Sequence, residues 1–348
     1  MKHTHLHTRL LALLLCCALV LPLSACGEAK STTQQIFAMD TVMDLTAYGK
    51  KADDGINAAI SIINSMDKLL DPENEHSKTY EINHTMGSPV VVNEQIAKML
   101  RTAMTVYERS NGAFDLTTYP LSKLWGFIDQ NYRVPSDAEI ERLLPCVDMS
   151  KVQLSATDDS ANSLVTMPAD MALSFGAVAK GCASEYAIQA MRAAGVTSGV
   201  VSLGGNVQTL GKKPDGSDWN IAIQDPNDTG SYLGYLTVGE TAVITSGSYQ
   251  RYFTEGGQKY HHILSPSTGR PVNNGLLAVT IVCEDGTLAD CLSTAMFVLG
   301  PQAALNYWRT YGGFEMLLVR TDGHVVITNG LYGQFTPNGD SYVVDYAS

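Results

Sequence analysis

Apolar residues recur at helical spacing in two segments of the first third of the chain. The first set is Ile56, Ile60, Ile63, Met66 and Leu70, and the second is Ile96, Leu100, Ala103 and Tyr107. Residues three or four apart share one face of a helix, so each set predicts an amphipathic helix that packs on a core. Ser136, followed three residues later by Glu139, has the pattern of a capping box and predicts a further helix start.

The second half of the chain is rich in short apolar segments with strand character. These segments are 200–203, 219–224, 235–238, 242–245, 276–282, 315–320 and 324–328. Asp322-Gly323 lies between the last two and predicts a hairpin. Strands joined by turns, with helices inserted at irregular intervals, predict an α+β fold with largely antiparallel sheets and flanking helices rather than a doubly wound fold.

The N-terminus has the features of a lipoprotein signal peptide. Lys2 and Arg9 give a weakly basic start, residues 10–21 are apolar, and the sequence LSAC ends at Cys26. Cleavage before Cys26 and lipidation of its thiol would anchor the protein to the outer face of a membrane. An ordinary secretory signal or an uncleaved anchor is the alternative, although the apolar run is short for a bilayer-spanning helix.

This pattern divides the chain into a signal peptide at 1–25, a polar tether at 26–36 and a domain at 37–348. The domain is long enough to bury a substantial core. Removing the signal leaves 21 of the 23 basic residues against 35 acidic residues, because Lys2 and Arg9 are lost. Such an acidic protein is not expected to bind nucleic acid.

Four cysteines remain in the predicted domain, at positions 146, 182, 283 and 291. The even number permits disulfides, but the spacing favours neither disulfides nor a zinc site. Cys182 and Cys291 lie beside small residues in helical patterns. Buried free thiols are the expected explanation for these two.

Asp290 and Thr294 are the most informative pair in the sequence. They stand four apart in a segment that reads as a helix, so a carboxylate and a hydroxyl share one face. Residues 278–282 form a β-branched apolar run and 284–286 a turn, so strand, turn and helix start meet here. The donors suit magnesium, and phosphates bind at such junctions. The alternative is an ordinary helix cap followed by a packed threonine.

Two further motifs have both a binding and a structural interpretation. Residues 112–127, GAFDLTTYPLSKLWGF, combine aromatic rings with a carboxylate and could bind a planar heteroaromatic ligand, or could close a loop over the core. Residues 175–187, FGAVAKGCASEYA, place small residues around Lys180 at a helix start. A phosphate could approach there, although a solvated lysine is the ordinary alternative.

Two later strands end in unusual sequences, the first rich in glycine and the second rich in hydroxyl side chains. Residues 202–207, SLGGNV, end a buried strand in two glycines, which make a tight turn or admit a ligand against the backbone. Residues 244–253, ITSGSYQRYF, end a strand in small hydroxyl side chains followed by Tyr249, Arg251 and Tyr252.

The order of these motifs resembles that of the ApbE family, the FAD:protein FMN transferases. The resemblance begins near residue 37 and reaches the C-terminus. The motifs that carry it are Met39-Asp40-Thr41, GAFD with WGF, GAVAKG, SLGGN, WNIAIQDP, TSGSYQRYF, HHILSPSTGRP and ADCLSTA.

The resemblance implies a T-fold-like α+β domain that binds FAD and Mg²⁺. It implies cleavage of the FAD pyrophosphate and attachment of FMN to a Ser or Thr of an acceptor flavoprotein outside the cytoplasm, with AMP released. The signal peptide agrees with that location and with a lipid-anchored protein. A magnesium-dependent FAD pyrophosphatase and a non-catalytic flavin-binding lipoprotein are the two alternatives.

The resemblance also implies roles for individual residues. The metal site would comprise Asp290, Thr294 and the backbone carbonyl of Ala177, and His262 would be the base for the attacking hydroxyl, with His261 the less favoured neighbour. The flavin side would comprise Met39, Ala113, Phe114, Asp115, Ser174, Lys180, Gly204, Gly205, Asn206 and Ile263.

Three positions depart from the family pattern. Ser174 and Ser265 stand where family members often have Asp, which affects the expected adenosine and flavin contacts. The tyrosine that often stacks on the ligand has no clean counterpart, because Tyr80 is offset.

Overall fold

The computed structural model describes residues 30–347, and these form one compact unit that begins at Ser31. The strands are β1 Ser31–Ala38, β2 Thr41–Tyr48, β3 Val90–Asn93, β4 Gln153–Ala156, β5 Asn162–Thr166, β6 Gly199–Leu203, β7 Asn206–Leu210, β8 Trp219–Gln224, β9 Tyr232–Val238, β10 Ala242–Gly247, β11 Tyr252–Glu255, β12 Gln258–His261, β13 Leu276–Cys283, β14 Glu315–Arg320, β15 His324–Thr328, β16 Phe335–Pro337 and β17 Val343–Ala347. The helices are α2 Ala52–Leu70, α3 Lys78–His84, α4 Glu94–Arg109, α5 Tyr119–Leu124, α6 Asp137–Leu143, α7 Ala179–Ala193, α8 Gly286–Leu299 and α9 Pro301–Tyr311.

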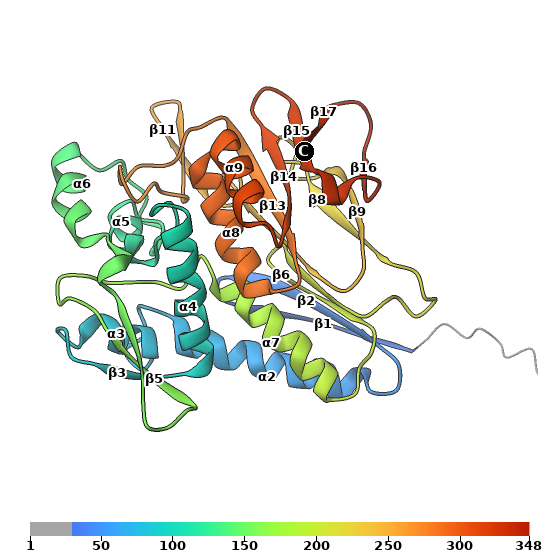
Figure 1. Ribbon diagram of the computed structural model, residues 1–348, viewed down its shortest axis with the longest axis horizontal. Helices are drawn as coiled ribbons and strands as arrows, with labels where there is room; N and C mark the ends of the chain where they lie inside the picture. Colours follow the sequence, from blue (N-terminus) through green and yellow to red (C-terminus); the bar gives the residue numbers. More distant parts are fainter. Residues whose placement is uncertain (1–29, 348) are drawn as a thin grey trace, which may run out of the picture. The chain divides into compact units, whose positions relative to one another are not determined.

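A nine-stranded sheet is the framework of the domain, with strand order β1-β2-β6-β7-β10-β13-β14-β15-β17 (Figure 1). Every neighbouring pair in this sheet is antiparallel except β15 and β17, which are parallel. The hairpin predicted at Asp322-Gly323 joins β14 to β15, and Gly323 supplies a positive φ of 83°. The predicted α+β fold is confirmed.

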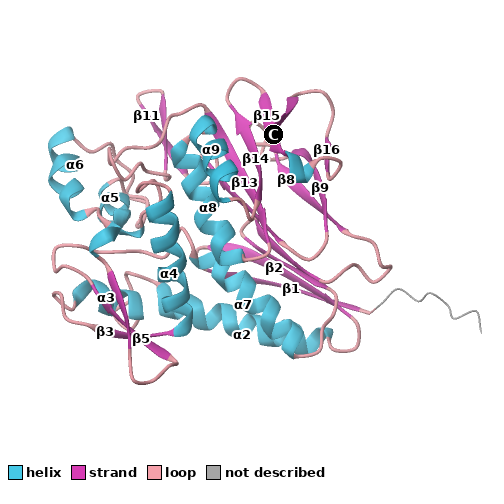
Figure 2. Cartoon of the chain, viewed as in Figure 1, coloured by secondary structure: helices cyan, strands magenta, loops and turns pink. Residues whose placement is uncertain are grey.

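Helices cover one face of this sheet (Figure 2). The buried stripe of α2, which includes Ile56, Ile63 and Met66, packs against α7 and the first two strands. Helix α8 lies against α7, β10 and β13, and α4 packs on α8. Because α8 is covered on nearly all sides, most of its side chains are buried, including the polar residue Asp290.

A second, three-stranded sheet of β16, β9 and β8 packs on the opposite face. Trp219, Ile221 and Leu236 of this small sheet pack with Val243 of β10 and Leu317 of β14. The large sheet is therefore apolar on both faces, which explains why its central strands are near-continuous apolar runs in the sequence.

The helices predicted from periodicity are confirmed as α2 and α4. The capping box is also confirmed: the Ser136 hydroxyl accepts from the Glu139 N–H, and the Glu139 carboxylate accepts from the Ser136 N–H. No helix in the described part of the chain is long and apolar enough to cross a membrane.

The tether expected at residues 26–36 is wrong for residues 31–36. These residues belong to β1, which pairs with β2 along its whole length, from Ser31 opposite Tyr48 to Ala38 opposite Thr41. Only Ala38 of this edge strand is buried, so its sequence is polar and lacks the apolar alternation of a half-buried strand. The predicted signal peptide and Cys26 lie outside the described residues.

All four cysteines of the domain have free thiols, and Cys182, Cys283 and Cys291 are buried. The expectation of buried free thiols at 182 and 291 is therefore confirmed.

Candidate active site

A single cavity of about 1110 Å³ lies where the large sheet, the start of α7 and the middle of α8 meet. Every residue that the sequence assigned to the flavin, the metal or proton transfer lines it. These residues are Met39, Ala113, Phe114, Asp115, Ser174, Ala177, Lys180, Gly204, Gly205, Asn206, His262, Ile263, Asp290 and Thr294. Segments from six separate motifs thus converge on one site.

Two tight hairpin turns form part of the cavity wall. Met39 and Asp40 join β1 to β2 with φ of 48° and 56°, and Gly204 and Gly205 join β6 to β7 with φ of 62° and 92°. Two successive positive φ angles are those of a two-residue type I′ turn, which glycine adopts without strain. A Cβ on Gly204 would lie 2.5 Å from Oγ1 of Thr41, so the two turns also require a glycine for their close approach.

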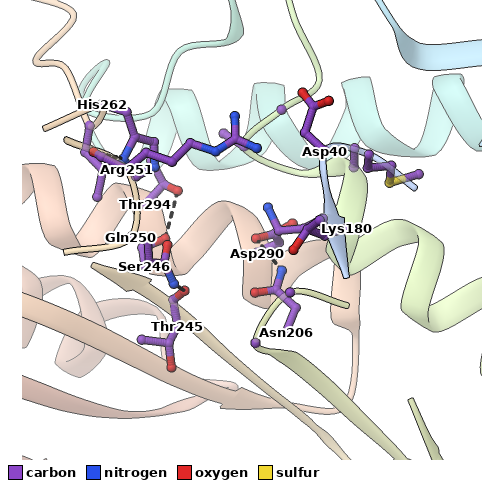
Figure 3. A pocket seen from close by; sticks show the side chains of 18 of the residues that line it. Asp40, Lys180, Asn206, Thr245, Ser246, Gln250, Arg251, His262, Asp290 and Thr294 are labelled. Carbon is purple, nitrogen blue, oxygen red and sulfur yellow. Dashed lines mark hydrogen bonds between the residues drawn. The ribbon is translucent and has the colours of Figure 1, made fainter. Parts of the chain in front are cut away.

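Asp290 is a buried carboxylate that is held from two sides (Figure 3). Its Oδ2 accepts from the backbone N–H of Gly181 at 2.8 Å, and its Oδ1 accepts from the Asn206 side chain at 3.0 Å. Burial raises the pKa of Asp290, whereas the Lys180 ammonium and the two hydrogen bonds lower it. The carboxylate is thus fixed in place, and each oxygen keeps acceptor capacity toward the cavity.

Thr294 lies one turn further along α8 and lines the same cavity. Its hydroxyl is 3.2 Å from that of Ser246 on β10. Together with the Ala177 backbone these donors are a carboxylate, a hydroxyl and a carbonyl, all of them the oxygen ligands that Mg²⁺ prefers. Residues 30–347 contain no cluster of three or more His, Cys, Asp or Glu that could hold a metal. The chemistry of the donors, a carboxylate with neutral oxygens, is compatible with a magnesium ion that would take its remaining ligands from water and substrate phosphates.

His262 is fixed by the backbone of Arg251. Its Nδ1 lies 3.2 Å from the Arg251 carbonyl, and its own N–H donates to the same oxygen at 3.1 Å. A carbonyl only accepts, so Nδ1 carries the proton and Nε2 is left as the acceptor. Burial and the positive charge of Arg251 lower the pKa of His262 to about 3, so the free imidazole is neutral at physiological pH.

His261 has a structural role. It is buried, its Nε2–H donates to the Val272 carbonyl at 2.7 Å, and its Nδ1 accepts from the Ile263 N–H at 3.3 Å. Both ring nitrogens are occupied and the ring packs edge-on against Phe297. Among the residues that line the cavity is His262, whereas His261 is not one of them.

Two cations line the cavity among the residues that the structure describes, Lys180 and Arg251. Lys180 lies beside Asp290, and Arg251 extends from the side of His262 (Figure 3). The N–H of Gly181 in the first turn of α7 is engaged by Asp290. The positive charge that this helix start offers to a phosphate therefore comes mainly from the Lys180 side chain.

Some aromatic residues of the motif at 112–127 line the cavity, and others are buried in the core. Phe114 and Phe127 line the cavity, whereas Trp125 is fully buried and donates to the Gly269 carbonyl at 2.8 Å. The carboxylate of Asp115 accepts from the N–H groups of Thr117 and Met149 at 2.7 and 3.0 Å. Asp115 thus stabilises the loop that shapes the cavity, with its oxygens turned to protein donors.

The three departures from the family pattern have local explanations. Ser174 lines the cavity and its hydroxyl accepts from the Gly176 N–H at 3.2 Å, the bond that an Asp makes in an Asx turn. Ser265 lies in a turn outside the cavity lining, where its hydroxyl pairs with that of Ser267. Tyr80 stacks on His84 instead of lining the cavity.

Several cavity residues had no assigned role in the sequence. Among them are Asp40, Asp67, Thr245, Gln250 and Arg251. Asp67 accepts from the Met39 N–H at 2.8 Å and so supports the β1–β2 turn from the end of α2. The motif at 244–253 contained Thr245, Gln250 and Arg251, and its polar residues after an apolar strand were the available signal.

Comparison with known proteins agrees with the motif order. The chain matches the ApbE family over residues 39–318. It is 29% identical to the FAD:protein FMN transferase of Treponema pallidum, covering 88% of this chain and 90% of the relative. It is 30% identical to the FAD:protein FMN transferase of Klebsiella pneumoniae, covering 81% and 87%. A crystal structure of the ApbE protein of Thermotoga maritima superposes with a TM-score of 0.81 and 30% identity, covering 88% of this chain and 99% of that one.

Proposed function

Because this chain belongs to the ApbE family, we propose that it is a magnesium-dependent FAD:protein FMN transferase that modifies a Ser or Thr hydroxyl of an acceptor protein. The observation that carries this proposal is the meeting of three kinds of group in one cavity. The cavity is lined by a neutral imidazole, by oxygen donors suited to a divalent cation, and by two cationic side chains. Its volume of about 1110 Å³ suits a ligand as large as a dinucleotide.

In the proposed reaction, the acceptor hydroxyl oxygen attacks the phosphorus of the FMN half of FAD. A new P–O bond forms, the bond to the bridging pyrophosphate oxygen breaks, and AMP leaves with that oxygen. The hydroxyl proton passes to Nε2 of His262, the ring nitrogen that the Arg251 carbonyl leaves free. The oxidation state of the flavin ring does not change. The products are a flavinylated acceptor, AMP and one proton.

The remaining groups act on charge and position. Asp290, Thr294 and the Ala177 carbonyl would hold the magnesium ion, whose chemistry is to neutralise negative charge on the pyrophosphate oxygens. Lys180 adds positive charge from the neighbouring helix start. Such prearranged charges require no reorganisation during the reaction, and losing one typically costs about 10²-fold or more in rate.

The proposed location is outside the cytoplasm, on a membrane, through a lipid on Cys26. The support is the LSAC sequence and the apolar run that precedes it. Mass spectrometry of the membrane fraction tests this: a mature N-terminus at lipidated Cys26 is expected. An intact Met1, or a soluble product cut elsewhere, would contradict it.

Incubation with FAD, Mg²⁺ and a candidate acceptor domain tests the activity. Intact mass of the acceptor is expected to rise by one FMN phosphoester, and a Ser/Thr→Ala change at the modified site should prevent the increase. Free FMN and AMP with an unmodified acceptor would indicate a pyrophosphatase instead. FAD binding without AMP release would indicate a non-catalytic flavin-binding protein.

A further inference from the structure

Strands β11 and β12 form a hairpin that leads directly into the active-site cavity. Arg251 precedes β11, His262 follows β12, and both line the cavity. The hairpin is a separate two-stranded sheet (Figure 1). Its register pairs Tyr252 with His261 and Thr254 with Lys259.

The hydrogen-bond pattern identifies which backbone groups face outward. The His262 N–H donates to the Arg251 carbonyl, so these two residues form a hydrogen-bonded pair of the ladder. Bonded and non-bonded pairs alternate in an antiparallel ladder. The pairs of Tyr252 with His261 and of Thr254 with Lys259 are therefore non-bonded, and the N–H and C=O of Tyr252 and Thr254 point away from β12.

The outer edge of β11 is open, whereas that of β12 is partly covered. No other strand of residues 30–347 pairs with β11. On the β12 side, the Val272 carbonyl accepts from His261 and the Val272 N–H donates to Ile263 at 3.0 Å. An open edge with unpaired N–H and C=O groups is a template for an added strand.

Aromatic contacts support this edge. Phe253 stacks on Tyr132 and on Tyr260, with ring centroids 5.3 Å from each. Lys259 lies over the ring of Tyr252 at 3.9 Å. Tyr252 is nevertheless 47% exposed, so the edge is held in strand geometry while it remains accessible.

We propose that the outer edge of β11 docks the acceptor protein by strand addition. An extended segment of the acceptor, adjacent to its reactive Ser or Thr, pairs with the backbone of Tyr252 and Thr254 as a third strand. Arg251 directly precedes β11 and lines the cavity, so a segment that runs along β11 toward Arg251 is directed to the cavity that also contains His262. Main-chain pairing of this kind supplies affinity for segments of varied sequence. The inference rests on the proposed transfer to a protein hydroxyl.

Thr254→Pro tests the proposal because it removes an outward N–H and no bond of the hairpin ladder. Proline is tolerated at such edge positions. We expect the KM for the acceptor to rise about 10-fold or more, since strand pairing is lost, while the Kd for FAD stays within about 2-fold. Thr254→Ala keeps the N–H and should behave as wild type.

Amide hydrogen exchange supplies a second measurement that does not depend on proline. Adding an acceptor domain whose reactive residue is changed to Ala should protect the amides of Tyr252 and Thr254. Wild-type acceptor KM in Thr254→Pro with no protection of these amides would overturn strand docking while leaving the transferase function intact. If wild-type enzyme labels no acceptor at all, the proposed function fails and the docking proposal fails with it.

Discussion

The carboxylate of Asp290 accepts a hydrogen bond from the backbone N–H of Gly181 at 2.8 Å, which joins α8 to the first turn of α7. The two helices approach so closely that a Cβ on Gly181 would lie 2.2 Å from the Gly286 carbonyl and 2.5 Å from Cβ of Asp290. The position of the proposed metal ligand is therefore set by a glycine contact more than 100 residues away in sequence.

Gly181→Ala is expected to destabilise the protein by about 2–3 kcal/mol, because the added methyl group must push α7 away from α8. A loss of stability would be informative, because helix propensity alone predicts the opposite: alanine is the better helix former by about 1 kcal/mol. Gly176→Ala is the control, because its Cβ would meet only Oγ of Ser174 at 3.5 Å. Chemical denaturation of the two variants measures the difference, and equal stabilities would contradict the close helix contact.

Asp290→Asn is expected to lower FMN transfer at low magnesium by about 10²-fold, since an amide is a weaker ligand than a carboxylate. Added magnesium should restore part of the rate. Glu284→Gln is the matched control, because it removes an exposed carboxylate just before α8 that lies outside the main cavity. Magnesium titrations of flavin-fluorescent acceptor bands measure both variants. Full transfer by Asp290→Asn at low magnesium would show that the metal assignment is wrong.

His262→Ala and His261→Ala should separate chemistry from folding. Loss of His262 removes the proton acceptor, so transfer falls by about 10²-fold or more while FAD still binds. Loss of His261 leaves the Val272 carbonyl and the Ile263 N–H without their partner and should cost about 2 kcal/mol of stability. Transfer rates, FAD titration and thermal unfolding measured on both variants distinguish the roles. The assignment is wrong if the two variants exchange these phenotypes.

The lowered pKa of His262 predicts a pH dependence of stability. Its pKa falls from 6.5 to about 3 on folding, so between these values the unfolded chain binds more protons than the folded one. The contribution of this residue is therefore present above pH 6.5 and is lost as the pH falls toward 3. From pH 7 to 5 the wild type should lose up to about 2 kcal/mol more stability than His262→Ala, and less than this where solvent reaches the partly exposed ring. Urea unfolding at the two pH values tests this, and parallel losses would contradict a partly buried imidazole that stays neutral on folding.

Sequence patterns predicted the parts of the fold that follow local rules. Ile56 and Ile63 mark the buried stripe of α2, and Asp322-Gly323 marks a hairpin, because each signal lies within one element. Strand β1 was missed because an edge strand with exposed faces has no apolar alternation. Its stability comes from backbone pairing with β2, which local sequence does not encode.

In the candidate site too, the sequence identified which residues take part but not the contacts that the fold creates. Ordered motifs identified residues that converge on one cavity, including His262 and Asp290. They did not show that Asp115 turns its oxygens to Thr117 and Met149, or that the Arg251 carbonyl fixes the His262 tautomer. These relationships depend on backbone groups brought together by the fold, so side-chain identity alone does not reveal them.

The stoichiometry of AMP release tests the central claim most directly. Enzyme is incubated with FAD and an acceptor domain, with magnesium or with a chelator, and AMP is quantified alongside the flavinylated acceptor. The account predicts one AMP for each FMN attached, with both products lost when the chelator is present. AMP released in excess with free FMN and no labelled acceptor, or labelling that proceeds equally in the chelator, would contradict it.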